Sequence, residues 1–113
     1  MTDKDLIEKI RFDDNGLVPV IAQDIETKET LMLAWVDKAN IINTIETGLA
    51  HYYSRSRKEK WLKGETSGCY QHVEKILLDC DEDAVLYMVK QTGAACHTGS
   101  FSCFFNVIFD KFV

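Results

Sequence analysis

Short apolar runs with the length and composition of β-strands constrain the fold of this chain most strongly. They are rich in β-branched and aromatic residues and are separated by polar or turn-forming stretches. None approaches the ~20 apolar residues that a membrane-spanning helix needs. The sequence therefore predicts strands at Val18–Gln23, Thr30–Val36, His51–Ser54, Val73–Leu78, Val85–Val89 and Phe104–Phe109.

Two short helices are predicted between these strands. Residues Asp3–Ile10 carry apolar side chains at helical spacing, and Asp37 is a typical N-cap for a second helix that Gly48 ends. In that second helix Ile41, Ile42 and Ile45 are expected to line one face. The order of the elements predicts an α+β, β-rich fold with a mainly antiparallel sheet and an intervening polar loop at Arg55–Ser67.

Composition favours one compact domain over residues 1–113. Hydrophobic residues make up 46% of the chain, and the net charge of −5 argues against general nucleic-acid binding. The acidic N-terminus lacks the apolar region of a signal peptide, so a cytoplasmic location away from membranes is expected. In that compartment four cysteines are expected to be metal ligands or buried residues, not a disulfide framework.

Three of these cysteines, Cys80, Cys96 and Cys103, lie in the last third of the chain. Structural zinc sites usually contain Cys-x-x-Cys pairs, which are absent here, whereas three protein ligands and a water are typical of catalytic zinc. Three unrelated buried thiols remain the alternative. His97 is a candidate fourth ligand, ligand partner or general base, and Cys69 is interpreted as a small apolar residue.

A row of alternating carboxylates surrounds the first of these thiols. In an extended backbone Asp79, Asp81 and Asp83 would project from one face and Cys80 from the other. Carboxylate oxygens are ligands that Mg²⁺ prefers, and a cation would relieve the repulsion between them. A solvated acidic turn is the alternative.

A positive segment stands out in this acidic chain. Arg55, Arg57 and Lys63 accompany Trp61, whose ring could stack on a base, and Glu65 is a candidate acid or base. Cationic side chains with free backbone N–H groups suit a phosphate. The segment is therefore a candidate substrate-binding loop, with a solvated charged loop as the alternative.

Several motifs together resemble the phosphoribosyl-AMP cyclohydrolase family, in its form without a second enzymatic domain. The resemblance covers nearly the whole chain and departs from the family at Cys69, where Asn is usual, and at Lys60, where Leu is common. The motifs that carry it are Tyr53-Ser54-Arg55-Ser56-Arg57, Trp61-Leu62-Lys63-Gly64-Glu65-Thr66-Ser67-Gly68, Asp79-Cys80-Asp81-Glu82-Asp83, Gln91-Thr92-Gly93-Ala94-Ala95-Cys96-His97-Thr98-Gly99 and Ser102-Cys103-Phe104.

The resemblance implies an intertwined homodimer with zinc shared between subunits. Cys80 of one subunit would meet Cys96 and Cys103 of the other, and the three aspartates would bind magnesium. The implied reaction is the third step of histidine biosynthesis, hydrolysis of the N1–C6 bond of the adenine ring of phosphoribosyl-AMP. We expect zinc-activated water to attack C6 and His97 or Glu65 to move the proton.

Two other functions are compatible with the residues alone. One is a zinc-stabilised interaction module without chemistry, and the other is a related metal-dependent nucleotide hydrolase with a different base or bond. The open three-thiol set and the positive segment argue against the first.

Overall fold

The computed structural model describes residues 3–112, so residues 1, 2 and 113 of the predicted domain lie outside the described part. No helix in this range has the length and apolar character to cross a membrane. The elements are α1 (Lys4–Lys9), β1 (Val18–Asp24), β2 (Thr30–Val36), α2 (Lys38–Thr47), β3 (His51–Ser54), β4 (Glu59–Leu62), β5 (Gln71–Leu78) and β6 (Val85–Gln91).

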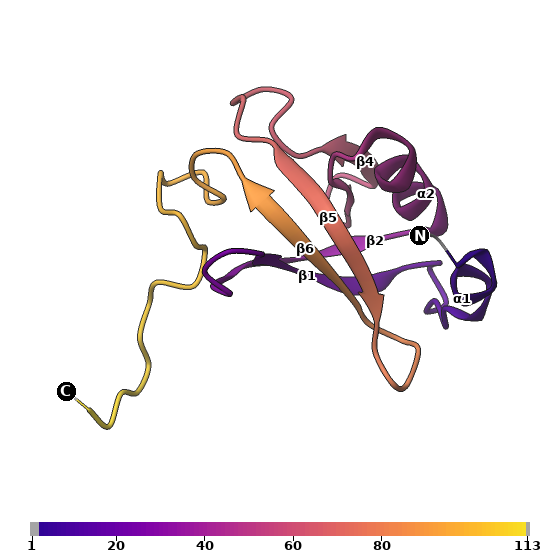
Figure 1. The fold of residues 1–113 in the computed structure, drawn as a ribbon, viewed down its shortest axis with the longest axis horizontal. Coiled ribbons are helices and arrows are strands. Elements are labelled where there is room, and N and C mark those ends of the chain that lie inside the picture. The colour runs from indigo at the N-terminus through magenta and orange to yellow at the C-terminus, as the bar shows by residue number, and fades with distance from the viewer. Residues whose placement is uncertain (1–2, 113) are drawn as a thin grey trace.

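The six strands form one sheet in the order β4-β3-β2-β1-β6-β5 (Figure 1). All neighbours pair antiparallel except β1 and β6, which are parallel. The sheet also curls, because Ala50, just before β3, donates its N–H to the carbonyl of Gln71 at the start of β5. The predicted α+β fold with a mainly antiparallel sheet is confirmed.

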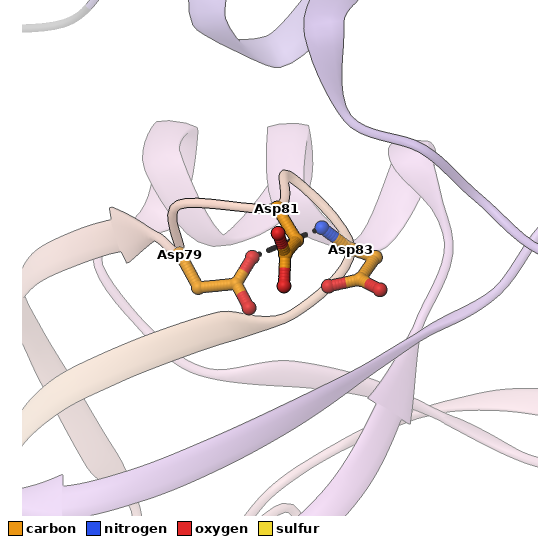
Figure 2. Close-up of side chains that lie close together, drawn as sticks. All are labelled: Asp79, Asp81 and Asp83. Carbon is orange, nitrogen blue, oxygen red and sulfur yellow. Dashed lines mark hydrogen bonds between the residues drawn. The ribbon is translucent and has the colours of Figure 1, made fainter.

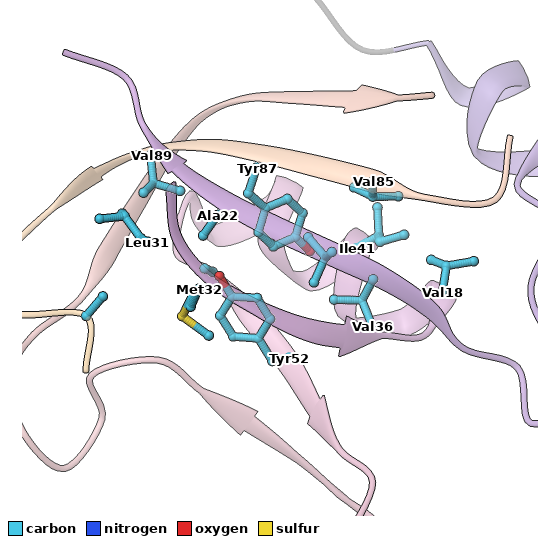
Figure 3. Close-up of a cluster of buried hydrophobic side chains, with 13 residues drawn as sticks. Val18, Ala22, Leu31, Met32, Val36, Ile41, Tyr52, Val85, Tyr87 and Val89 are labelled. Atoms are coloured by element: carbon cyan, nitrogen blue, oxygen red, sulfur yellow. The ribbon is translucent and has the colours of Figure 1, made fainter. Parts of the chain in front are cut away.

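Alternation along the parallel pair β1 and β6 builds the core. On β1 every second residue from Val18 is buried, and on β6 Val85, Tyr87 and Val89 are buried in the same way. These side chains pack with those of β2, β3 and α2 (Figure 3). Because strand residues alternate between faces, the intervening positions of β1 and β6 point to the opposite, outer face of the sheet.

Capping side chains begin both helices where the sequence predicts. The Asp3 carboxylate accepts from two backbone N–H groups at the start of α1, and Asp37 forms a capping box with Asn40 at the start of α2. Gly48 ends α2 with φ of 76°, in the left-handed region that glycine tolerates.

The buried face of α2 differs from the prediction. Ile41 is buried, but Ile42 and Ile45 are exposed, and Asn40 and Thr44 take the remaining core positions. Thr44 is tolerated there because its hydroxyl donates to the Asn40 carbonyl oxygen at 2.8 Å. Of the three isoleucines predicted to line one face of this helix, only Ile41 is therefore part of the core.

The predicted loop at Arg55–Ser67 contains a strand. β4 pairs with β3 as a hairpin, with Ser54 opposite Glu59 and Tyr52 opposite Trp61. Glu59 and Lys60 are exposed, so this edge strand lacks the apolar pattern by which strands are predicted.

The predicted strand at Phe104–Phe109 is absent from the structure. The segment runs away from the body of the molecule as an extended tail (Figure 1), and no described strand pairs with it. Its apolar side chains are exposed, with Ile108 and Phe109 among the most exposed in residues 3–112. Strand propensity alone does not make a strand without a neighbouring strand to bond to.

Candidate functional site

The three aspartates come together in the turn between β5 and β6. Ligand oxygens of Asp79, Asp81 and Asp83 all lie within 4.8 Å of one another, and all three residues are exposed (Figure 2). Three carboxylates at this separation repel one another and suit a hard divalent cation that bridges them. The donor set therefore fits magnesium, whose remaining ligands would be water or substrate oxygens.

A tight turn, not an extended strand, produces this cluster. The Asp79 carboxylate accepts from the backbone N–H of Asp83 at 3.0 Å and of Ala84 at 3.2 Å. Glu82 adopts a positive φ of 65°, and its carbonyl accepts from the N–H of Arg11 at 2.7 Å. The carboxylates lie between the two predicted strands, but they converge within a turn instead of projecting from one face of an extended backbone.

The second group of predicted ligands lies in the loop that follows β6. Cys96 and Cys103 lie near enough to each other that each shifts the pKa of the other. The backbone N–H of Cys103 donates to the Leu31 carbonyl at 2.7 Å, and the Ser102 hydroxyl donates to the Thr30 carbonyl at 2.6 Å. These bonds fix the loop against the first half of β2.

The two thiols of this pair differ in acidity. The Thr98 hydroxyl donates to Sγ of Cys96 at 3.1 Å, and this contact is the main reason that the pKa of Cys96 is lowered. The pKa of Cys103 is raised, first because its sulfur is partly shielded from water and then by its contact with Cys96. Cys96 thus becomes a thiolate, the form that binds metal, before Cys103 does.

Cys80 is far from this pair within one chain. It lies in the β5–β6 turn, whereas Cys96 follows the other end of β6 (Figure 1). Strands advance ~3.3 Å per residue, so the length of β6 alone separates the two by roughly 20 Å. One copy therefore brings together two of the three predicted zinc ligands and keeps Cys80 apart from them.

The positive segment divides between two places. The guanidinium of Arg55 lies 4.1 Å from the centroid of the Trp35 ring, while Arg57 is exposed and pairs with Glu59 at 3.6 Å. Lys63 turns toward the thiol loop, where its ammonium donates to the Ala95 carbonyl. Lys63 therefore supplies positive charge beside Cys96, whose pKa it helps to lower.

Trp61 and Gly64 pack closely against neighbouring residues on the side of Lys63. The Lys63 ammonium lies 5.7 Å from the Trp61 ring, which also packs 5.0 Å from the ring of Tyr52. Gly64 is required here, because a Cβ would lie 2.6 Å from the backbone nitrogen of Tyr70. The Trp61 ring thus packs against the core through its contact with Tyr52.

The two candidate catalytic residues are exposed. His97 lies between the Cys96 and Thr98 that share a hydrogen bond, and Glu65 lies two residues after Lys63. Among residues 3–112 neither side chain makes a hydrogen bond or salt bridge. Both side chains are therefore accessible from solvent.

The structure adds residues that sequence reasoning missed. A shallow hollow of about 570 Å³ includes Asp81, Asp83, Pro19 and Trp35 in its lining. Trp35 was assigned only to a strand, and its stacking on Arg55 leaves no signal in the local sequence because the two are twenty residues apart. Thr98 belongs to one of the family motifs, and only its geometry reveals its action on Cys96.

Comparison with known proteins agrees with this arrangement. The family model described as phosphoribosyl-AMP cyclohydrolase matches residues 32–105, a range that contains both the acidic turn and the thiol loop.

Curated relatives that carry the same name match over most of their length. A protein of Archaeoglobus fulgidus is 58% identical over 98 residues, which cover 87% of this chain and 91% of the relative. One of Neisseria meningitidis is 54% identical over 106 residues, covering 93% and 81%. One of Haloquadratum walsbyi is 58% identical over 100 residues, covering 88% and 76%. The chain belongs to the phosphoribosyl-AMP cyclohydrolase family.

Proposed function

We propose that this protein hydrolyses the N1–C6 bond of the adenine ring of phosphoribosyl-AMP, the third step of histidine biosynthesis. The product is an imidazole carboxamide that carries a formimino-linked phosphoribosyl arm. The observation that carries the proposal is the family match across the acidic turn and the thiol loop, together with the name of the relatives.

The proposed active unit is a cytoplasmic homodimer with two equivalent sites. Each site combines Cys80 of one subunit with Cys96 and Cys103 of the other. The separation of these thiols in one chain, and the proximity of Cys96 to Cys103, support this division. Three thiolates leave one position of a tetrahedral zinc ion for water, and bound zinc lowers the pKa of such a water to about 7.

The acidic turn would hold magnesium at the substrate phosphates. Asp79, Asp81 and Asp83 supply the oxygens, and the family's phosphate-rich substrate supplies further ligands. Arg55 and Lys63 would place positive charge on the substrate from the two ends of the β3–β4 hairpin. Trp61 would offer its free face to the base. These contacts fix the ring for attack.

The bond changes are simple to follow. Water adds to C6, the N1–C6 bond breaks, and N1 leaves with a proton while the exocyclic nitrogen stays on C6 as the carboxamide. His97 is the proposed proton carrier, because its imidazole is exposed in the thiol loop and can both accept and donate a proton. Glu65 is the alternative carrier.

The ultraviolet absorbance of phosphoribosyl-AMP during incubation with the protein tests this proposal, with metal content measured on the same sample. We expect an absorbance change that depends on protein and on magnesium, and about one zinc per chain. Protein that contains zinc but leaves the substrate intact would contradict the proposed reaction.

A further inference from the structure

Three hydrogen-bonded side chains, Tyr52, Gln71 and Gln91, cross the core at the end of the sheet that leads into the thiol loop. The Tyr52 hydroxyl donates to Oε1 of Gln71, and Nε2 of Gln71 donates to Oε1 of Gln91 at 2.9 Å. The same Nε2 also donates to Sδ of Met32 at 3.4 Å. Tyr52 and Gln71 are fully buried, and Tyr52 lies among the apolar side chains of the core (Figure 3). We call these three residues the buried polar chain.

The curl of the sheet brings the buried polar chain together. Gln71 begins β5 and Gln91 ends β6, and the two residues lie opposite each other in the antiparallel pair. Tyr52 is on β3, which is not a neighbour of β5 in the strand order. It reaches Gln71 because the N–H of Ala50 donates to the Gln71 carbonyl at 3.0 Å. The chain therefore joins three strands at the place where the thiol loop begins.

Each member of the buried polar chain has only one possible orientation. Nε2 of Gln91 donates to the carbonyl of Thr92 at 3.0 Å and to that of Cys69 at 3.4 Å. Backbone carbonyls only accept, so the Gln91 amide must present its nitrogen to them and its oxygen to Gln71. At the other end, burial raises the pKa of Tyr52, so its hydroxyl keeps its proton and donates.

Such a fully paired chain fixes geometry more than it adds stability. A buried hydrogen bond contributes a net ~1 kcal/mol, whereas a buried group left without a partner costs about 1–3 kcal/mol. An arrangement that breaks one of these bonds is therefore disfavoured by more than the bond itself contributes. The chain thus selects one backbone arrangement at the exit of β6.

The backbone that it selects is the start of the thiol loop. The N–H of Thr92 donates to the Tyr70 carbonyl at 3.0 Å, and its carbonyl accepts from Gln91, so both backbone groups of Thr92 are held. Cys96 follows four residues later, and its N–H donates to the Ser100 carbonyl within the loop at 3.1 Å. The position of Cys96 therefore depends on how the loop leaves β6.

Tyr52 contacts the same loop by a second route. Its ring packs 5.0 Å from the ring of Trp61, which lies opposite it on β4. Lys63, two residues after Trp61, donates from its ammonium to the carbonyl of Ala95. Ala95 is itself buried in the core. The core thus holds the first part of the loop at two points, Thr92 and Ala95.

We propose that Gln71 is a positioning residue, whose buried amide fixes the start of the thiol loop through Gln91 and thereby places Cys96 in the active site. This inference rests on the proposed function, since it takes Cys96 as a ligand of the catalytic metal. Gln71 is buried and acts only through its neighbours. Its loss should lower kcat and leave KM nearly unchanged, because the proposed phosphate contacts of the acidic turn lie at the other end of β6.

Gln71→Met tests the proposal, because it removes the amide and keeps the length of the side chain. It leaves the Tyr52 hydroxyl and Oε1 of Gln91 without their partner. We expect kcat to fall by roughly 10- to 100-fold. We also expect the bonded amides of Ala95 and Cys96 to exchange hydrogen faster relative to the amides of β1. Steady-state kinetics and hydrogen exchange on the protein as purified measure these effects, and circular dichroism reports folding.

Thr44→Val is the matched control. The Thr44 side chain is also buried, and its hydroxyl has three hydrogen-bond partners: the Asn40 carbonyl at 2.8 Å, the His51 N–H at 3.0 Å and the Tyr87 hydroxyl at 3.3 Å. None of these partners belongs to the thiol loop. The variant should therefore lower the free energy of unfolding without changing kcat or the exchange of the loop relative to β1.

The outcomes separate positioning from general stability. A loop loosened selectively and a lower kcat in Gln71→Met, but not in Thr44→Val, support the proposal. Equal changes in both variants, no selective loosening in Gln71→Met, or a loosened loop with unchanged kcat overturn it.

Two further results are decided by the same measurements. Should Gln71→Met fail to fold, Tyr52→Phe must loosen the loop and Tyr87→Phe must not, since each removes one buried hydroxyl; equal effects overturn the proposal. Wild-type protein that leaves phosphoribosyl-AMP intact refutes the proposed function. Selective loosening in Gln71→Met would then still support the role of Gln71 in fixing the loop, and unselective loosening would overturn it.

Discussion

The two ends of β6 carry two ligand groups that differ in how they are assembled. At its start, the β5–β6 turn brings three carboxylates together from five consecutive residues, Asp79–Asp83, within one chain. Beyond its end, the loop brings Cys96 to Cys103 but not to Cys80. The acidic group is complete in the single chain, whereas the single chain brings together only two of the three proposed thiol ligands.

This difference shows which ligand groups a local sequence motif can assemble without distant residues. A turn held by its own backbone hydrogen bonds needs only neighbouring residues to place its ligands. A thiol set divided between the ends of a strand cannot be completed by neighbouring residues, and in the proposed homodimer it depends on how the second chain docks. Changes at the two ends should therefore have separable effects on metal content, assembly and turnover.

The largest effect is expected from Cys96→Ser. This variant removes a thiolate from the incomplete set, so we expect zinc content to fall to background and turnover to fall by about 1,000-fold or more. Metal analysis and the absorbance assay on the same preparation measure both. Cys69→Ser is the control, because Cys69 lies outside both ligand groups, and it should retain zinc and activity. A zinc-free, fully active Cys96→Ser enzyme would contradict the assignment.

Mixing two inactive variants tests the division of the thiols directly. Cys80→Ser and Cys96→Ser chains each lack a ligand in both sites of their own homodimers. After unfolding, mixing at equal amounts and refolding, half of the dimers should be mixed, each with one intact site, so activity should return to about one quarter of wild type. Two variants that stay inactive together, although mixed dimers form by mass spectrometry, would show that one chain supplies all ligands.

A smaller effect is expected at the complete end. Asp81→Asn removes one charge from the acidic turn and leaves the thiols unchanged, so zinc content should remain while KM at fixed magnesium rises by roughly 10-fold. Steady-state kinetics across magnesium concentrations measure this. Asp14→Asn, on an exposed residue outside the cluster, is the control. Identical magnesium dependence in Asp81→Asn and wild type would remove the carboxylate assignment.

The same contrast explains what the sequence predicts well. Strands β1, β2 and β6 have strong apolar patterns and caps or turns at their ends, so their positions follow from local residues. The acidic turn is predictable for the same reason. The ends of α2 are predictable in the same way, because Asp37 is a typical N-cap residue and Gly48 a typical C-terminal cap.

Features that depend on distant partners are not predictable in this way. β4 is recognisable only by its pairing with β3, and the apolar tail at Phe104–Phe109 has strand composition but no strand beside it in one chain. The stacking of Arg55 on Trp35 and the burial of Thr44 also follow from tertiary contacts. Each of these features can be recognised only from the three-dimensional structure.

The smallest expected effect lies within the thiol pair itself. In metal-free protein the Thr98 hydroxyl favours the Cys96 thiolate, so the pKa of Cys96 is lowered, whereas the pKa of Cys103 is raised. A lowered pKa means that the thiolate is populated at lower pH. Alkylation of Cys96 by iodoacetamide should therefore reach half its maximal rate at a pH below that of an ordinary cysteine, and alkylation of Cys103 at a pH above it.

Site-resolved mass spectrometry separates the two cysteines from Cys69 and Cys80 in this experiment. Thr98→Val removes the hydroxyl but keeps the shape of the side chain, so the midpoint for Cys96 should move to higher pH. Thr92→Val, at another exposed threonine near the end of β6, should leave it unchanged. If the Cys96 midpoint ignores Thr98→Val, the difference between the two thiols has another cause. If it moves, the Thr98 hydroxyl sets the acidity of Cys96 from within the same loop.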